Sequence, residues 1–463
     1  MKWSQLLSDH RAGREISGLS GSDLRSEFQK DYHRIIVSAS FRRLQDKTQV
    51  FPLDKSDFIR TRLTHSLEVA SIGRSLAENI SESILERGLD DEFNERTASR
   101  IISVIESAGL IHDIGNPPFG HFGEESIREW FGRHLPRLRY GKRSVLELLT
   151  PQQAADLYHF EGNAQGLRVL TKLHFSENGC GMNLTYGLLS AMVKYPNSSV
   201  GMRPGSDAVA DRKMGFFEAE TKIFNDIQRW TGTEGKRNPL VFILEAADDI
   251  AYATADIEDA VKKGFLDYPL LRQELRMRGI DVEFVESLES AYGRSLRKGE
   301  RSDGEHAIKL WLLRVQDILI LKATEQFVAG YRQLMAGQYA KPLLSGCREA
   351  KLLTALKRIA YDYAFTSQSI FKTEIAANNI INYLLGRLVP AALLYRAEVP
   401  QGLMEEKYLS LISENYRRVY ERAVSGLPDD QCLYHRLLLA TDTVAGMTDS
   451  YARDLYTDLN GIT

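Results

Sequence analysis

The segment Ala108-Gly-Leu-Ile-His112-Asp113-Ile-Gly-Asn-Pro-Pro-Phe-Gly-His121-Phe-Gly-Glu124 is the most informative part of this chain. Apolar residues between 101 and 111 recur at steps of three and four, which predicts a buried helix that runs up to His112. Gly115 and the proline pair at 117–118 then break that helix. A histidine and a carboxylate at a helix end can bind a metal, although such a pair can also be a histidine oriented by its neighbour. Adjacent residues point about 100° apart on a helix, so other helices must supply further ligands.

Composition and charge narrow the class of protein. With 463 residues, 43% of them hydrophobic, the chain can bury a large core, and its length allows two or three domains. A formal net charge of -3 argues against a globally basic nucleic-acid-binding protein, although residues 133–143 form a local basic cluster. Three distant cysteines without a CxxC motif exclude a disulfide framework and a cysteine-based zinc knuckle: Cys180, Cys347 and Cys432.

Neither a signal peptide nor a membrane span is expected. The N-terminus lacks the apolar centre of a signal peptide, and no run of about 18 apolar residues occurs. Together with the sparse cysteines, these features predict a cytoplasmic protein.

The first third of the chain is expected to alternate between helices and breaks. Residues 1–30 are polar and predict a mobile arm, with regular structure starting at residue 31. We expect a helix over 31–45 and a short strand or hairpin over 47–52, where β-branched and aromatic residues gather. Thr64 can cap the next helix, whose first turn would carry His65. Residues 131–158 form a basic insertion punctuated by prolines.

From residue 240 onward the sequence is almost continuously amphipathic with the helical period. The expected helices span 240–260, 308–334, 351–365, 373–393, 409–423 and 435–459. No glycine-rich strand-to-helix turn and no alternation of strands with helices is present, which argues against a doubly wound α/β fold. We predict an all-α fold with at most a short hairpin, divided into an arm (1–30), a catalytic core (31–270) and a helical C-terminal region (271–463).

A third stretch, residues 245–259, has an informative spacing. Asp248, Tyr252 and Asp256 lie four residues apart and share one face of the predicted helix. Two acids and a tyrosine among alanines suit the wall of a ligand site, and a solvated acidic face is the alternative.

Together, these stretches supply a mixed nitrogen and oxygen donor set of two imidazoles and two carboxylates. It consists of His65, His112, Asp113 and Asp248. Such a set suits Mn or Mg and also Co, Ni, Fe or Zn, and it does not suit Cu(I). A metal held in this way can keep open positions for water and a substrate phosphate.

His121 and Glu124 form a second candidate pair. They lie three residues apart in a segment that is expected to resume as a helix after the proline pair, so their side chains can form a hydrogen bond. This is the arrangement of a general acid or base with an orienting carboxylate. The alternative is a capping or surface histidine, and proximity to His112 and Asp113 favours catalysis.

Seven motifs in this order resemble those of the bacterial dGTP triphosphohydrolases of the HD-domain superfamily. The resemblance runs from about residue 30 to 455 and rests on Thr48-Gln-Val-Phe-Pro52, Arg62-Leu-Thr-His65-Ser-Leu-Glu, His112-Asp-Ile-Gly-Asn-Pro-Pro-Phe-Gly-His121-Phe-Gly-Glu124, Phe160-Glu-Gly-Asn-Ala-Gln, Lys194-Tyr-Pro196, Glu245-Ala-Ala-Asp248-Asp-Ile-Ala-Tyr252 and Ala445-Gly-Met-Thr-Asp449. It implies hydrolysis of a dNTP at the α-phosphorus to deoxynucleoside and inorganic triphosphate.

The resemblance also implies a role for each matching residue. The metal ligands would be His65, His112, Asp113 and Asp248, and His121 supported by Glu124 would be catalytic. The substrate contacts would be Gln49 (sugar and base), Arg62 (α-phosphate), Tyr252 and Asp256 (deoxyribose), and Lys194, Tyr195 and Lys213 (phosphates). Tyr252 packed against the C2′ edge would leave little room for a 2′-hydroxyl. The chain departs from the family's common Arg-His-Pro-Leu by carrying Asn238 at the histidine position, which concerns helix capping rather than a ligand.

Family members commonly form symmetric hexamers, so the resemblance implies a homo-oligomer with C-terminal helices at subunit contacts. Relatives also bind single-stranded DNA, for which the cluster at 133–143 is the candidate here. Two other functions stay open. One is an HD-superfamily phosphodiesterase or nucleotidase acting on another nucleotide, and the other is a regulatory protein that responds to nucleotides or single-stranded DNA. The complete ligand set favours an enzyme, and Arg62 with the Tyr252 and Asp256 stripe favours a dNTP.

Overall fold

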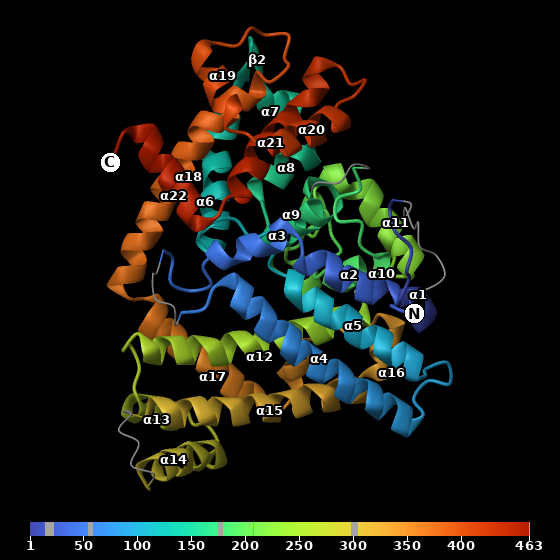
Figure 1. Ribbon diagram of the computed structural model, residues 1–463, viewed down its shortest axis with the longest axis vertical. Coiled ribbons are helices and arrows are strands. Elements are labelled where there is room, and N and C mark those ends of the chain that lie inside the picture. Colours follow the sequence, from blue (N-terminus) through green and yellow to red (C-terminus); the bar gives the residue numbers. More distant parts are fainter. Residues whose placement is uncertain (14–22, 54–58, 175–178, 207, 298–303, 463) are drawn as a thin grey trace.

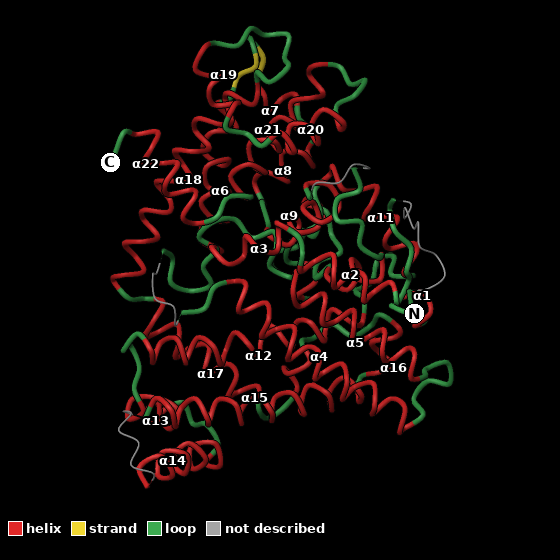
Figure 2. Tube along the Cα trace, viewed as in Figure 1, coloured by secondary structure: helices red, strands yellow, loops and turns green. Residues whose placement is uncertain are grey.

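The predicted all-α fold is confirmed by a computed structural model, which describes residues 1–13, 23–53, 59–174, 179–206, 208–297 and 304–462. Helices make up 70% of the structure and strands 1%. The strands form one two-stranded antiparallel hairpin, which Figure 2 shows in yellow among red helices.

The helices pack around two buried hydrophobic clusters, and the first occupies the lower half of Figure 1. Its helices are α1 (Trp3–Leu6), α2 (Glu27–Ile36), α3 (Ala39–Arg42), η1 (Arg43–Asp46), α4 (Arg62–Arg87), α5 (Glu95–Ile111), α10 (Tyr186–Met192), α11 (Thr221–Thr231), α12 (Pro239–Lys262), α13 (Tyr268–Met277), α14 (Val282–Arg297), α15 (Glu305–Ala329), α16 (Tyr331–Ala336), η7 (Leu343–Gly346), α17 (Ala350–Ala360) and the π-helical η8 (Tyr361–Phe365).

The second cluster lies above the first in the same view. Its elements are α6 (Gly120–His134), η2 (Leu135–Arg137), β1 (Arg139–Tyr140), β2 (Arg143–Ser144), α7 (Val145–Leu148), α8 (Pro151–Tyr158), α18 (Gln368–Leu393), α19 (Leu403–Ser410), α20 (Glu414–Ala423), η9 (Asp429–Cys432), α21 (Leu433–Ala445) and α22 (Asp449–Asn460). Short connecting helices complete the chain: α9 (Gly162–Arg168), the π-helical η3 (Val169–Leu173), η4 (Ser199–Gly201), η5 (Val209–Asp211) and η6 (Glu218–Glu220).

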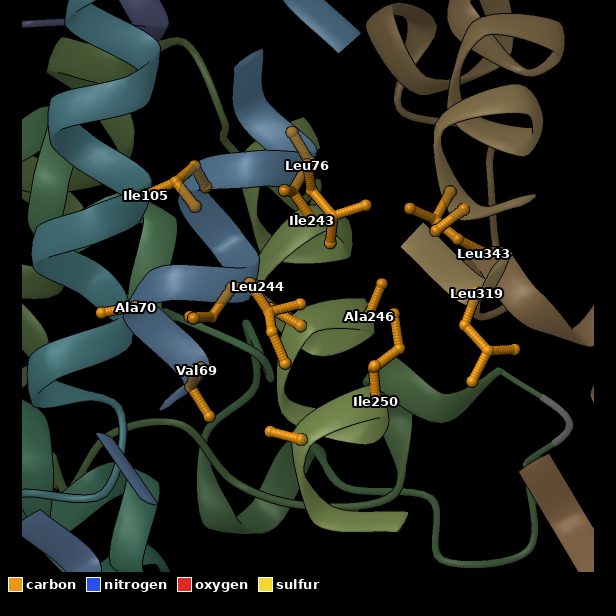
Figure 3. Close-up of a cluster of buried hydrophobic side chains, with 14 of the residues drawn as sticks. Val69, Ala70, Leu76, Ile105, Ile243, Leu244, Ala246, Ile250, Leu319 and Leu343 are labelled. Carbon is orange, nitrogen blue, oxygen red and sulfur yellow. The ribbon is translucent and has the colours of Figure 1, made fainter. Parts of the chain in front are cut away.

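The centre of the first cluster holds α4, α5 and α12 together. Figure 3 shows Val69 and Leu76 of α4, Ile105 of α5 and Leu244 and Ile250 of α12 within one apolar interior. Burying each such side chain contributes on the order of 1.5–3 kcal/mol. The helices α4 and α5 also approach closely, because a Cβ atom added at position 109 would lie 2.6 Å from a backbone atom of α4. A glycine three residues before His112 therefore brings the end of α5 against α4.

The predicted helix over 31–45 is wrong in its bounds. It begins earlier, as α2, because Ser26 and Gln29 form a capping box at its start. It ends at Ile36, and Ser38 caps the separate short helix α3. The predicted cap of the next helix is also wrong, since Thr61 rather than Thr64 is the N-cap of α4. Thr64 completes that capping box by accepting a hydrogen bond from the N–H of Thr61.

The strand predicted over 47–52 is wrong. The structure has one isolated β-bridge there, between Thr48 and Thr61, and no regular strand in the described residues 47–53. The residue content favoured a strand, but an extended segment becomes a strand only when a neighbour continues the ladder.

The amphipathic segments predicted after residue 240 are helical, with three interruptions. Gly330 separates α15 from α16, residues 411–413 separate α19 from α20, and residues 446–448 separate α21 from α22. The start of the predicted N-terminal arm is ordered against the core, because Trp3 is buried and its indole N–H donates to the hydroxyl of Tyr331 at 2.7 Å. Residues 14–22 of the arm lie outside the described residues. No helix of the described chain is long and apolar enough to cross a membrane.

Candidate active site

Three helices of the first cluster, α4, α5 and α12, bring the candidate metal ligands together. His65 lies in the first turn of α4, and His112 is the C-cap of α5, followed by Asp113. One ligand atom from each of these three residues lies within 4.8 Å of the others. Asp248 of α12 joins them, because its Oδ1 lies 3.2 Å from Nε2 of His65 and 3.5 Å from Nε2 of His112.

The state of the imidazoles fits metal binding. Nδ1 of His112 lies 2.8 Å from the carbonyl oxygen of Gly109, which can only accept, so Nδ1 carries the proton. Its Nε2 is then left with a lone pair, and that atom is buried without a hydrogen-bond partner among the described residues. A buried nitrogen lone pair facing two carboxylates is costly unless a cation satisfies it. The group of His65, His112 and Asp113 therefore fits a divalent metal.

Two cations adjoin this group. The guanidinium of Arg62, the first residue of α4, donates to Asp113 at 2.5 Å, and the ammonium of Lys194 lies 2.9 Å from Asp248. Burial alone would raise the pKa of Asp113, but the charge of Arg62 holds it well below its ordinary value. Burial likewise opposes the charge of Asp248, yet the charge of Lys194 lowers its pKa. Both carboxylates are thus ionised, as ligands must be.

His121 and Glu124 form the predicted pair at the start of α6. Nδ1 of His121 donates to Oε2 of Glu124 at 3.1 Å. The histidine side chain is 79% exposed and its carboxylate partner 2%, so a fixed buried group holds an accessible imidazole. Burial alone would raise the pKa of Glu124, but the hydrogen bond and charge of His121, together with Lys213 and the N–H of Gly162, lower it.

A close approach of α9 fixes Glu124 further. The N–H of Gly162 donates to Oε1 of Glu124 at 2.7 Å. A Cβ atom at position 162 would lie 2.1 Å from the side-chain oxygen of Asn116 and 2.5 Å from Oε1 of Glu124, so only glycine fits. Asn116 in turn donates to Asp113 at 2.7 Å. The motif that contains Gly162 thus contacts both candidate groups, through Glu124 of the His121 pair and through Asn116, which binds Asp113.

The stripe on α12 continues away from the metal group. Asp256 is 2% exposed, and neither of its carboxylate oxygens has a hydrogen-bond partner among the described residues. Burial, with a smaller contribution from the charge of Asp259, raises its pKa well above the ordinary value. Burial and Asp256 raise the pKa of Tyr252 as well, so the phenol keeps its proton. The side-chain oxygen of Gln49 is also buried, and no hydrogen-bond partner for it occurs in the described part of the chain.

Two further predicted substrate residues, Lys213 and Tyr195, have contacts outside the metal group. The ammonium of Lys213 pairs with Glu161 at 2.9 Å and lies 5.9 Å from the ring centre of Tyr195.

In the basic segment 133–143, Arg133 pairs with Glu129, and Arg143 lies 3.3 Å from Asp430, so two of the cations in this segment are already neutralised. Asn238 caps α12, as expected, by accepting from the N–H of Leu240 at 3.0 Å.

Sequence reasoning assigned no role to Asn116 or Glu161, although both belong to motifs that were singled out. Asn116 orients Asp113, and Glu161 binds Lys213 and accepts from the amide of Asn163 at 2.9 Å. Their place within two of the motifs was the available signal.

Comparison with known proteins agrees with this arrangement of helices and ligands. Residues 62–164 match the HD domain. The chain is 44% identical to a deoxyguanosinetriphosphate triphosphohydrolase-like protein of Listeria monocytogenes and 32% identical to one of Synechocystis. Each of these alignments covers 100% of this chain and 100% of the relative. It is 32% identical to the deoxyguanosinetriphosphate triphosphohydrolase of Serratia proteamaculans over 94% of each chain.

The all-α fold, the group of His65, His112 and Asp113, and the match to the HD domain together define an HD-domain phosphohydrolase with a divalent-metal site. Within that class, the full-length similarities show that the chain belongs to the family of deoxyguanosinetriphosphate triphosphohydrolase-like proteins.

Proposed function

We propose that this protein is a metal-dependent dNTP triphosphohydrolase that prefers dGTP and uses Mn or Mg. The observation that carries the proposal is the continuous stripe on α12. Asp248 faces the metal group, and Tyr252 and Asp256 follow at four-residue steps on the same face. A single helix therefore spans the distance from a phosphate-activating centre to a polar group that can meet the sugar.

Unsatisfied polar atoms mark where a substrate would bind. The carboxyl of Asp256, the side-chain oxygen of Gln49 and Nε of Arg62 are buried without hydrogen-bond partners among the described residues. Such atoms cost on the order of 1–3 kcal/mol each unless a ligand satisfies them. A 3′-hydroxyl can pair with Asp256, the sugar and base with Gln49, and a phosphate oxygen with Arg62. The similarity to proteins named for dGTP hydrolysis supports the same class of substrate.

The proposed reaction is displacement at the α-phosphorus. A water oxygen attacks that phosphorus, its bond to the 5′-oxygen breaks, and a proton reaches the 5′-oxygen, which gives deoxynucleoside and triphosphate. When bound, a divalent metal polarises the phosphate and eases deprotonation of the attacking water. Arg62 and Lys194 add positive charge where the phosphates would lie.

His121 is the residue we assign to proton transfer. Glu124 accepts a hydrogen bond from Nδ1–H of the imidazole. The other ring nitrogen, Nε2, can then exchange a proton with the 5′-oxygen or with water. Because the histidine side chain is 79% exposed, it is accessible to a bound substrate.

Substitution of the metal group tests the proposal. His112→Ala and Asp113→Ala should each lower bound metal and abolish dNTP hydrolysis, because the ligand cage would be incomplete. A matched control is His134→Ala, since that histidine stacks on Trp130 at 4.6 Å in the second cluster. Elemental analysis measures the metal content of each variant. Hydrolysis is assayed separately with each dNTP in turn. Full metal content with full activity in either ligand variant would reject the assignment.

A further inference from the structure

The segment Ala445-Gly-Met-Thr-Asp449 joins α21 to α22, and the proposed reaction gives it no role. Asp449 is the first residue of α22 and is 2% exposed. Its Oδ2 accepts from the N–H of Thr48 at 3.0 Å and from the hydroxyl of the same threonine. Its Oδ1 accepts from the N–H of Phe119 at 2.9 Å. One carboxylate thus binds two segments that lie far apart in the sequence.

Both partners stand next to candidate site residues. Thr48 directly precedes Gln49, the candidate contact for sugar and base. Phe119 is the N-cap of α6 and lies two residues before the candidate catalytic His121. Any shift of these two backbone N–H groups would move a substrate-binding side chain and the proposed proton donor together.

The turn that Asp449 holds is strained. Phe119 has a φ of 64°, a left-handed conformation that residues with a side chain rarely adopt. Gly120 follows with a φ of 63°, and a Cβ atom there would lie 2.5 Å from the guanidinium of Arg62. The turn is therefore held between Asp449 on one side and Arg62 on the other, and strained turns persist only when their surroundings fix them.

Lys47 adds a second connection to the same segment. Its ammonium is buried and donates to the carbonyl of Ala445 at 3.0 Å and to the carbonyl of Asn116 at 2.5 Å. Asn116 donates in turn to Asp113. Successive residues 47 and 48 thus tie the site to the connection between α21 and α22.

We propose that Asp449 is a positioning residue through which the C-terminal helices hold Gln49 and His121 in their working geometry. The inference rests on the proposed function, because those two side chains act on the substrate only if that function holds. Asp449 touches the backbone behind them and not the reacting atoms. A displacement of about 1 Å at such a site can cost roughly 100-fold in rate.

The test uses Asp449→Asn in the full chain. Asparagine keeps the size and one acceptor but places an NH₂ where two donors now meet, so it cannot hold both segments. We expect kcat to fall by roughly 10- to 100-fold while bound metal stays at the wild-type level. The matched control is Asp31→Asn, because Asp31 is fully buried and accepts from the N–H and hydroxyl of Thr185 at 3.0 Å and 2.6 Å, in a contact between α2 and the start of α10. The control should keep its kcat.

A double mutant separates positioning from general destabilisation. In a His121→Ala background, the further loss of kcat from Asp449→Asn should shrink to about twofold or less, because the proton-transfer group that it positions is gone and the other positioned residue, Gln49, contributes to substrate binding. An equal loss in both backgrounds would overturn the inference. If Asp449→Asn does not fold, Thr48→Val removes only the hydroxyl donor. It should lower kcat several-fold without metal loss, and an unchanged kcat would overturn the inference.

Amide hydrogen exchange gives a readout that needs no substrate. Exchange at Phe119 should accelerate in Asp449→Asn and stay at the wild-type rate in Asp31→Asn. If the wild type hydrolyses dNTPs and Asp449→Asn retains both kcat and protection, the inference fails and the proposed function stands. If the wild type hydrolyses no dNTP, the proposed function fails, and the exchange result alone decides whether Asp449 holds the turn.

Discussion

At the scale of single residues, His121 and Glu124 share a hydrogen bond but differ in burial. The imidazole is open to a substrate, whereas the carboxylate is enclosed and also accepts from the N–H of Gly162. The pair therefore divides into an accessible group that can exchange protons and a fixed group that orients it.

This division leads to different expectations for the two side chains. His121→Ala should keep its metal and its KM while kcat falls by roughly 10²- to 10⁴-fold, the range for loss of a general acid or base. Glu124→Ala should cost less in kcat, because the imidazole remains, and more in stability, because the N–H of Gly162 loses its partner. Steady-state kinetics measures kcat and KM of the two variants, and thermal unfolding measures their stability. Loss of metal in His121→Ala, or a normal kcat with raised KM, would make His121 a structural or binding residue.

The sequence predicted the group of residues that fits a metal better than the residues that orient it. His65, His112 and Asp113 were predictable because few residue types bind metals and their motifs are distinctive. Asn116 and Asp449 were not assigned, because an amide or a buried acid has many uses, and because two of the groups that Asp449 binds are backbone N–H groups. Such contacts depend on how segments distant in sequence meet in space.

At the scale of elements, α12 carries on one face both Asp248 and the two side chains to which we assign sugar recognition, Tyr252 and Asp256. Its periodicity was visible in the sequence, and the helix spans Pro239–Lys262, close to the predicted 240–260. The strand predicted over 47–52 failed because residue preference alone does not supply a neighbouring strand. The predicted cap at Thr64 failed because either threonine of the capping box satisfies the same sequence pattern.

The face of α12 predicts how the site selects the sugar. Tyr252→Ala should narrow the ratio of kcat/KM for dGTP over GTP, because the space beside C2′ would then admit a 2′-hydroxyl. Tyr252→Phe is the matched control, since it keeps the ring and removes only the hydroxyl, and it should retain most of the preference. The two ratios are measured with purified nucleotides, and an unchanged ratio in Tyr252→Ala would point to another residue as the gate.

At the scale of the whole molecule, a buried ionic network joins α9 and η6 to α21 of the second hydrophobic cluster. Arg168 of α9 binds Asp442 of α21 and Glu220 at 2.7 Å and 2.8 Å. His435 of α21 lies near these charges. Burial, together with Arg168 and Lys172, lowers its pKa to about 4.

That lowered pKa predicts a loss of stability in acid. An unfolded histidine has a pKa of about 6.5, so between about pH 6.5 and 4 the unfolded state binds more protons than the folded state. Stability from this residue is complete above that window and falls as the pH drops through it. His435→Gln should reduce the difference in urea midpoint between about pH 7 and pH 5, whereas His33→Gln, at an exposed position, should not. Equal pH dependence in wild type and His435→Gln would contradict this assignment.

Assembly is a further prediction at this scale. We expect a symmetric homo-oligomer, commonly a hexamer in the family that the sequence resembles. Three exposed apolar residues on one face of α15 are candidates for a subunit contact: Leu310, Leu313 and Leu321. Light scattering at about micromolar concentration should give a multiple of the chain mass of 52.4 kDa, and Leu313→Glu should shift it downward if this face is buried. A fully active monomer would contradict the prediction.

The central claim is cleavage between the α-phosphorus and the 5′-oxygen of a deoxynucleotide. Its most direct test is hydrolysis of dGTP with Mn or Mg in ¹⁸O-labelled water, with the products separated by chromatography and weighed by mass spectrometry. The proposed reaction predicts deoxyguanosine and inorganic triphosphate in equal amounts, with one labelled oxygen in the triphosphate and none in the deoxyguanosine. Release of pyrophosphate with dGMP, release of phosphate with dGDP, or label in the deoxyguanosine would contradict it.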